Sequence, residues 1–120
     1  MKIGEFIKLV QTTKDTVRHY EELELIRPVW ENRMREYSIK DLQDFYAIKE
    51  MQAMGLTLID IQVIFEIKRS DGCGSGQLIA GVLSRMENEM NLIYEAEEEL
   101  KTKKVMIQEM MKELQKITHP

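Results

Sequence analysis

The sequence predicts a mainly α fold in which several short helices and a small hairpin precede one long helix that pairs as a coiled coil. Its 120 residues contain two prolines and six glycines, so few residues interrupt helices. Hydrophobic residues make up 43% of the chain and charged residues 32%, enough to bury the core of about one domain. The C-terminal part repeats apolar residues with alternating spacings of four and three, which is typical of a coiled-coil seam.

Two short helices are expected first. Apolar residues at positions 3, 6, 7 and 10 have helical spacing, and Thr13 with Thr16 is typical of the start of a second helix. The second helix should bury Val17, Tyr20 and Leu23. Because a tight turn joins them, the two form a helix-turn-helix unit.

A small β-hairpin is expected over residues 27–37. Pro28 lies near its start, and Val29, Trp30 and Tyr37 have side chains that favour strands. We expect the Glu31-Asn32 pair to form the turn.

A third and a fourth helix follow the hairpin. Ser38 precedes Asp41 by three residues, and Thr57 precedes Asp60 by three, so each pair predicts a capping box at a helix start. Gly55 is expected to end the third helix. The expected core faces are Leu42, Phe45, Ile48 and Met51 in the third helix, and Leu58, Ile61, Ile64 and Phe65 in the fourth.

The long helix carries the strongest periodic pattern, in which nine of eleven seam positions are apolar. At roughly 60 Å it is too long to bury this seam against a domain of about 70 residues, so we expect a homodimer. Glu97 and Lys104 occupy seam positions, where an antiparallel pair lets them face each other and a parallel pair makes each repel its copy. The sequence thus predicts an antiparallel coiled-coil dimerisation helix. Its interface residues are Ile79, Leu83, Met86, Met90, Ile93, Glu97, Leu100, Lys104, Ile107, Met111 and Leu114.

The only Gly/Ser-rich stretch separates the long helix from the rest of the chain. We therefore expect a domain over residues 1–69, a hinge loop over 70–76, a dimerisation helix over 77–117 and a tail over 118–120.

Several classes of function are excluded. No run of about 18 uncharged apolar residues predicts a membrane span, and Glu5 interrupts the first apolar run, which argues against a signal peptide. A lone cysteine, Cys73, favours a cytoplasmic protein, and no Cys/His cluster predicts a metal site. No nucleotide-binding, hydrolase or metalloprotease motif is found, so neither an enzyme nor a cofactor is expected.

Charge patterning indicates a nucleic-acid partner in spite of a net charge of −4 and a pI of about 5.3. The second helix carries hydrogen-bond donors suited to groove edges and phosphates, and the hairpin carries arginines suited to the adjacent backbone or minor groove. The expected DNA-binding residues are Thr13, Lys14, Thr16, Arg18, His19 and Tyr20 on the helix, and Arg33, Arg35 and Tyr37 on the hairpin. The net charge favours the alternative, a dimeric protein-interaction adaptor that does not bind DNA.

Several motifs follow one another in a fixed order and spacing. They are Ile3-Gly4-Glu5-Phe6, Thr16-Val17-Arg18-His19-Tyr20-Glu21-Glu22, Leu25-Ile26-Arg27-Pro28, Asn32-Arg33-Met34-Arg35-Glu36-Tyr37, Asp41-Leu42 and Met54-Gly55-Leu56-Thr57-Leu58-Ile59-Asp60-Ile61. In this order and spacing the chain resembles the MerR (mercury-resistance regulator) family of bacterial transcriptional regulators. The resemblance extends through about residue 68, and the hinge and long helix fit the family layout.

The resemblance implies a winged helix-turn-helix DNA-binding domain and an antiparallel dimer on a pseudo-palindromic operator. Family members distort DNA between promoter elements, so double-stranded DNA and RNA polymerase are the implied partners, with an effector that the sequence does not identify. The expected site residues from Thr13 to His19 are placed at the groove and phosphates, whereas Tyr20 is placed at the backbone or in the core. Arg33, Arg35 and Tyr37 belong to the wing.

The chain departs from the family at several positions. Gln11 and Glu24 stand where glycines are common, so the two turns must form without the residue that enters left-handed conformations freely. His19 and Met34 replace common tyrosines. Metal-sensing relatives carry further cysteines beside one near the long helix, so Cys73 alone argues against metal sensing. Thiol sensing stays an open hypothesis, although no Lys, Arg or His adjoins Cys73 in the sequence to lower its pKa.

Overall fold

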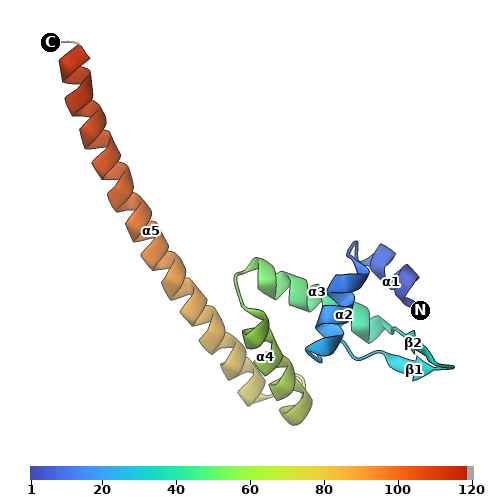
Figure 1. Ribbon diagram of the computed structural model, residues 1–120. Coiled ribbons are helices and arrows are strands. Elements are labelled where there is room, and N and C mark those ends of the chain that lie inside the picture. The colour runs from blue at the N-terminus through green and yellow to red at the C-terminus, as the bar shows by residue number, and fades with distance from the viewer. Residues whose placement is uncertain (119–120) are drawn as a thin grey trace. The chain divides into compact units, whose positions relative to one another are not determined.

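A computed structural model describes residues 1–118 and confirms a mainly helical chain with a small two-stranded wing (Figure 1). The elements in order are α1 (Ile3–Leu9), α2 (Lys14–Glu22), β1 (Val29–Glu31), β2 (Met34–Glu36), α3 (Ile39–Ala53), α4 (Leu58–Asp71) and α5 (Gly76–Thr118). The chain divides into one compact unit over Met1–Arg85 and a second from Met86 onward. Of the expected tail, Thr118 is the last helical residue, and 119–120 lie outside the described residues.

The starts of three helices confirm the predicted caps. The Thr13 hydroxyl accepts a hydrogen bond of 3.2 Å from the Thr16 amide at the start of α2. Complete capping boxes open α3, at Ser38 with Asp41, and α4, at Thr57 with Asp60. Each cap satisfies backbone amides that have no partner within the helix, so these starts are fixed by local sequence.

Helices α1 and α2 both end on a non-glycine residue with left-handed backbone. Gln11 has φ 52° and Glu24 has φ 59°. The amide after each donates to a carbonyl five residues earlier, from Thr12 to Ile7 at 3.1 Å and from Leu25 to Tyr20 at 2.9 Å. Both ends therefore use the Schellman geometry in which glycine is the usual residue.

Helix α3 ends in the same way but with the usual residue. Gly55 has φ 100°, and the Leu56 amide donates to the Met51 carbonyl at 3.1 Å. The predicted stop at Gly55 is confirmed. Because glycine has no Cβ, α3 makes its left-handed end without the strain that Gln11 and Glu24 carry.

The hairpin turn lies one residue later than predicted. Strands β1 and β2 are antiparallel and pair Trp30 with Arg35 and Glu31 with Met34, so Glu31 belongs to the ladder. The turn consists of Asn32 and Arg33, at φ 50° and 62°. A two-residue hairpin turn with positive φ at both positions matches the right-handed twist of the strands. Arg33 therefore occupies a position usually held by glycine.

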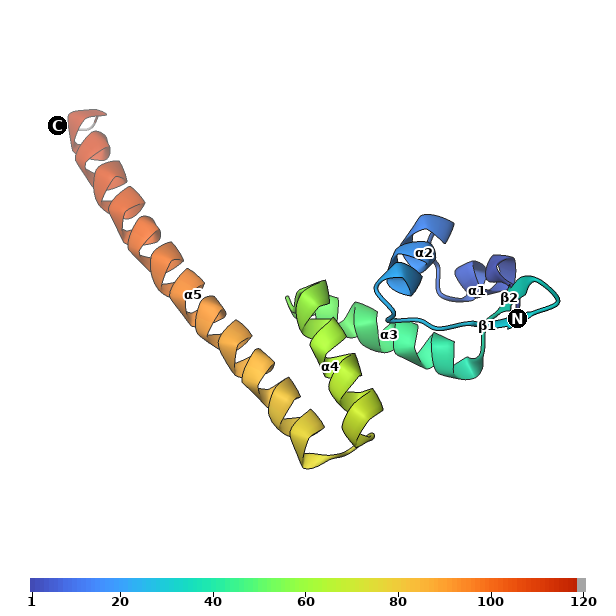
Figure 2. The same ribbon diagram turned by 60° about the horizontal axis from the view of Figure 1, so that its bottom comes forward.

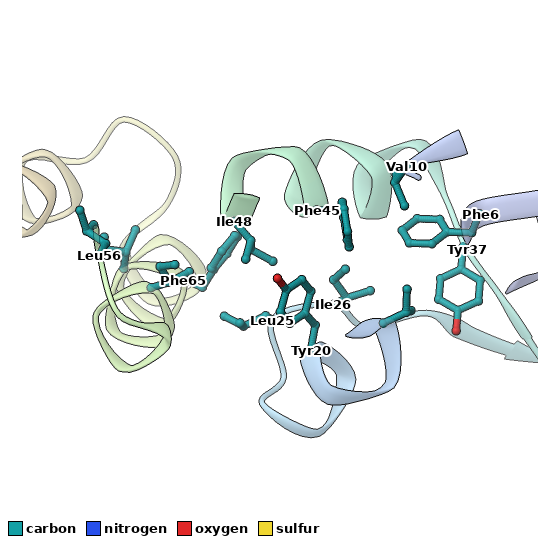
Figure 3. Packing of buried hydrophobic residues seen from close by; sticks show 13 residues of the cluster. Phe6, Val10, Tyr20, Leu25, Ile26, Tyr37, Phe45, Ile48, Leu56 and Phe65 are labelled. Atoms are coloured by element: carbon teal, nitrogen blue, oxygen red, sulfur yellow. The ribbon is translucent and has the colours of Figure 1, made fainter. Parts of the chain in front are cut away.

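The hydrophobic core of the first unit centres on aromatic residues from different elements. The rings of Phe6 and Tyr37 stack with centroids 4.7 Å apart, and Phe45 meets the Phe6 ring edge-on at 5.9 Å (Figure 3). The N-terminus lies beside the hairpin (Figure 2), where the Tyr37 amide donates to the Met1 carbonyl at 2.7 Å. The fully buried side chains are Phe6, Val17, Leu25, Ile26, Tyr37, Phe45, Ile48 and Ile61.

The first turns of α5 belong to the same core. Leu78 and Val82 pack against it, and Gly81 lies so close to α4 that a Cβ there would meet the Ile67 side chain at 2.9 Å. Arg85, the last residue of this unit, lies 3.6 Å from the Asp60 carboxylate. Helix α4 runs to Asp71, so the loop before α5 spans residues 72–75.

Helix α5 carries an apolar stripe whose seam residues are mostly exposed within residues 1–118. The helix has 43 residues, and none of them is fully buried, although Leu78 and Val82 pack against the core. At 1.5 Å per residue it is about 65 Å long. The exposed apolar seam residues are Ile79, Leu83, Met90, Ile93, Leu100, Ile107, Met111 and Leu114. Along residues 1–118, none of the helices combines the length and hydropathy that a membrane span requires.

Candidate nucleic-acid interface

Helix α2, the hairpin and Lys2, which precedes α1, bring five cationic side chains around one shallow hollow. The hollow has a volume of about 330 Å³. Its lining residues are Lys2, Ile3, Lys14, Arg18, Trp30, Arg33, Met34 and Arg35. Four of the residues predicted to contact DNA are thus adjacent in space, although they span 21 positions from Lys14 to Arg35. Lys2 and Trp30 could not be assigned to this surface from the sequence, because only the fold brings them to it.

Two cations of the hollow are free to meet phosphates. No ion pair is found for Lys14 or Arg33 within residues 1–118, and both side chains are exposed. Lys2 is different, because its ammonium lies 2.6 Å from the Glu36 carboxylate. Together with the N-terminal ammonium, this contact lowers the pKa of Glu36 to about 2. Glu36 therefore offsets part of the charge of Lys2.

A carboxylate joins the other two cations. Glu21 on α2 is 11% exposed, and its Oε1 lies 3.2 Å from Arg35 Nε. Its Oε2 lies 3.7 Å from Arg18 Nη1. The Arg35 guanidinium also lies over the Trp30 ring, 4.5 Å from its centroid. Both arginines are about one-third exposed (30% and 32%), so each is held by the protein and still reaches the surface.

Two aromatic residues expected at the DNA surface lie in the core instead. Tyr37 is 1% exposed because its ring stacks on Phe6, and its hydroxyl donates to Glu21 at 2.9 Å. Burial, followed by this contact with Glu21, raises the pKa of Tyr37 well above its ordinary range. Tyr20 is 2% exposed, and its hydroxyl donates to Gln52 at 2.6 Å. For Tyr20 the structure thus selects the core interpretation.

The remaining helix residues differ in their freedom to bind. Thr13 and Thr16 share a hydroxyl hydrogen bond of 2.9 Å at the helix cap. His19 is exposed, with Nδ1 3.9 Å from the Glu22 carboxylate. Lys14 is exposed on the first turn of the helix.

A second group of cations lies near the loop that contains Cys73. The thiol is exposed and lines a hollow of about 210 Å³ together with Lys40, Lys68 and Arg69. The buried Asp44 carboxylate lies 3.5 Å from Lys68 in the same hollow. These cations come from α3 and α4, and the fold brings them to the same hollow as the thiol. In the described part of the chain, no three His, Cys, Asp or Glu side chains lie close enough together to hold a metal ion.

Comparison with known proteins identifies the family. A family model described as "MerR HTH family regulatory protein" matches residues 1–67, which include α1, α2, the hairpin and α3. No curated protein and no solved structure matched the chain. The matched segment covers more than half of the 120 residues and contains every residue that lines the cationic hollow. The chain therefore belongs to the MerR family of helix-turn-helix DNA-binding transcription regulators.

Proposed function

We propose that the chain binds a pseudo-palindromic operator in double-stranded DNA as a homodimer. The observation that carries this proposal is the cationic hollow between α2 and the hairpin. Family membership favours it over the adaptor interpretation, which rests on the net charge of −4 alone. The charge average is no obstacle, because the counterion-release contribution depends on the Lys and Arg side chains that face phosphates.

Helix α2 is the proposed recognition helix, and the hairpin is the proposed wing. The exposed side chains of Lys14 and His19, with the partly exposed Arg18, lie on α2 where base edges and flanking phosphates are reached from the major groove. Arg33 lies in the hairpin turn, and Arg35 follows on β2, so both suit the adjacent backbone or minor groove. The proposed contact set omits the buried rings of Tyr20 and Tyr37.

The proposed dimer pairs α5 with its copy. We assign DNA binding to residues 1–69, a hinge to 70–76, dimerisation to 77–117 and a tail to 118–120. The exposed seam supports this assignment, because leucines and methionines along 65 Å of helix need a second apolar surface. In the antiparallel arrangement, Glu97 of each copy faces Lys104 of the other.

The dimer gives the DNA site its symmetry. Two winged domains related by a two-fold axis require two related half-sites, so the operator is pseudo-palindromic. We propose that the bound dimer distorts the operator at a promoter and so alters its use by RNA polymerase. Distortion of this kind stores a sequence-dependent energy in base steps that the protein does not touch.

The test begins with selection of bound duplexes from a pool of genomic fragments, followed by mobility-shift titrations at several salt concentrations. Arg18→Ala is expected to weaken binding to the selected operator by about 1–3 kcal/mol, which corresponds to roughly 5- to 160-fold. Arg35→Ala is expected to weaken binding to all duplexes and to reduce the salt slope by about 1. Lys112→Ala, an exposed lysine of α5 outside the seam, is the matched control and should bind like the parent. Parent-like binding by both arginine variants would overturn the proposed contact surface.

A further inference from the structure

Glu21 occupies a place in the proposed interface that its charge alone does not explain. A carboxylate among cations that face DNA reduces the local positive potential, and its position close to phosphates is electrostatically unfavourable. Glu21 is nevertheless almost buried, at 11% exposed, between the recognition helix and the wing. Its neighbour Glu22 has the ordinary position of a helix-surface acid, at 77% exposed.

The Glu21 carboxylate contacts three side chains on two elements. Oε1 accepts a hydrogen bond of 2.9 Å from the Tyr37 hydroxyl and lies 3.2 Å from Arg35 Nε. Oε2 is buried, makes no hydrogen bond within residues 1–118, and has Arg18 Nη1 at 3.7 Å. A buried carboxylate without compensating charge would destabilise the fold. The favourable interaction with the two guanidinium groups therefore keeps both of them beside Glu21.

The contact with Arg35 fixes the direction in which that side chain points. Arg35 contacts Glu21 through Nε, and its guanidinium carbon lies over the Trp30 ring, so the side chain is held by two contacts. The two terminal amino groups of the guanidinium remain available for a phosphate, because a guanidinium offers five donors in one plane. A lysine at this position would keep the charge but could not bond a carboxylate and a phosphate in this planar geometry.

We propose that Glu21 is a positioning residue that holds Arg18 of the recognition helix and Arg35 of the wing in the arrangement that the operator requires. This inference rests on the proposed function, and it adds a role for an acid that does not touch DNA. Holding side chains in place before binding reduces the ordering cost on association. Glu21 therefore raises the affinity for the operator while its charge lowers the affinity for any duplex.

The two effects have opposite signs, so one substitution separates them. Glu21→Gln keeps the shape of the side chain and removes the charge, and Glu22→Gln makes the same change in net charge one residue away. If charge alone matters, both variants bind the operator and a shuffled duplex more tightly than the parent. If Glu21 positions the arginines, Glu21→Gln loses about tenfold in operator affinity, the effect of one lost base contact. Relative to Glu22→Gln, the same variant loses less affinity for the shuffled duplex than for the operator, because only the operator offers Arg18 its base contact.

A second variant tests the route through Arg35 while keeping both the Glu21 carboxylate and the positive charge at position 35. Arg35→Lys is expected to lose a similar factor for the operator and to keep the salt slope of the parent. In a double-mutant cycle, Glu21→Gln should add little to Arg35→Lys, because both remove the same arrangement. Thermal unfolding of each variant, and far-UV circular dichroism, identify any loss that comes from misfolding. Should Glu21→Gln not fold, Arg35→Lys decides alone.

The outcomes distinguish this inference from the proposed function. If the parent enriches no duplex from the fragment pool, the proposed function fails and the positioning role fails with it. If the parent selects an operator but folded Glu21→Gln binds it as tightly as Glu22→Gln, only the positioning role is overturned. Arg35→Lys that binds the operator like the parent overturns it too.

Discussion

The Tyr20 hydroxyl donates a hydrogen bond of 2.6 Å to the side-chain oxygen of Gln52, and so joins α2 to α3. The Tyr20 ring is buried beside Phe45, with centroids 5.6 Å apart. Helix α2, the proposed recognition helix, is thus joined to α3 by Tyr20, which the family resemblance placed either at the DNA backbone or in the core.

Tyr20→Phe should lower the free energy of unfolding by about 1 kcal/mol, because Gln52 loses its hydroxyl partner while the ring stays packed. Affinity for DNA should not change. Urea unfolding and a mobility-shift titration of the same preparation measure the two effects. Tyr46→Phe is the matched control, since its exposed hydroxyl makes a longer bond of 3.4 Å to the Leu9 carbonyl. A loss of DNA affinity with unchanged stability would place the Tyr20 hydroxyl at the DNA surface.

Gln11→Gly should stabilise the chain by about 1 kcal/mol. A left-handed backbone costs an L-residue about 1–2 kcal/mol, and the greater entropy of glycine in the unfolded chain offsets part of the gain from removing that strain. Gln11 has φ 52°, and its side chain is exposed. Gln11→Ala is the control, since alanine keeps the Cβ and should give no gain. Urea unfolding at neutral pH gives both values. Equal effects of the two substitutions would show that the strain at position 11 is negligible.

Leu100→Asp should weaken self-association about a thousandfold. A dimer loses two buried leucines, each worth about 2 kcal/mol, and 1.4 kcal/mol corresponds to a factor of ten. Leu92→Asp makes the same chemical change, with the same loss of helix propensity, at an exposed position outside the seam. Sedimentation equilibrium at micromolar concentration should find a dimer for the parent and Leu92→Asp and a monomer for Leu100→Asp. A monomeric parent would overturn the homodimer itself.

Glu36 should make the free energy of unfolding depend on pH in the acid range. Hydrogen bonds from Lys2 and from the N-terminal ammonium lower its pKa from 4.5 to about 2 in the folded chain. The contribution of Glu36 is therefore complete above about pH 4.5 and is lost as the pH falls from 4.5 towards 2. Glu36→Gln should be less stable than the parent at pH 7, and the difference should close over that window.

Urea unfolding at a series of pH values measures this difference. Glu31→Gln is the control, because Glu31 lies on the same hairpin and no ion pair is found for it within the described residues. Its stability relative to the parent should vary little between pH 5 and pH 2.5. A difference between Glu36→Gln and the parent that is independent of pH would contradict the assigned ion pairs.

Local sequence was sufficient for most of the helical fold. Caps at Thr13, Ser38 and Thr57 and the stop at Gly55 depend on residues within a few positions, so these four helix boundaries could be predicted. The hairpin turn could not be placed correctly, because Arg33 gives no sign that it accepts a left-handed backbone. Asn-Gly would have given that sign.

The site was harder to predict, because its side chains are sorted by distant contacts. Tyr37 resembles a wing residue until Phe6, 31 positions earlier, is seen to cover its ring. Glu21 stands among polar residues on a helix, and its spacing of three from Arg18 was the one local signal of their contact. Its contact with Arg35 depends on the fold of the hairpin over α2, which no local pattern specifies.

The packing of Gly81 against Ile67 decides where the molecule can be divided for experiments. The glycine-rich loop after Asp71 looks like a natural point at which to truncate the chain. Truncation there would remove Leu78 and Val82 from the core and expose the apolar surface of α4 that they cover. A fragment that ends after Arg85 keeps those turns and the Arg85–Asp60 contact. Such a fragment is the better choice for measuring the affinity of a single DNA-binding unit for one half-site of the proposed operator.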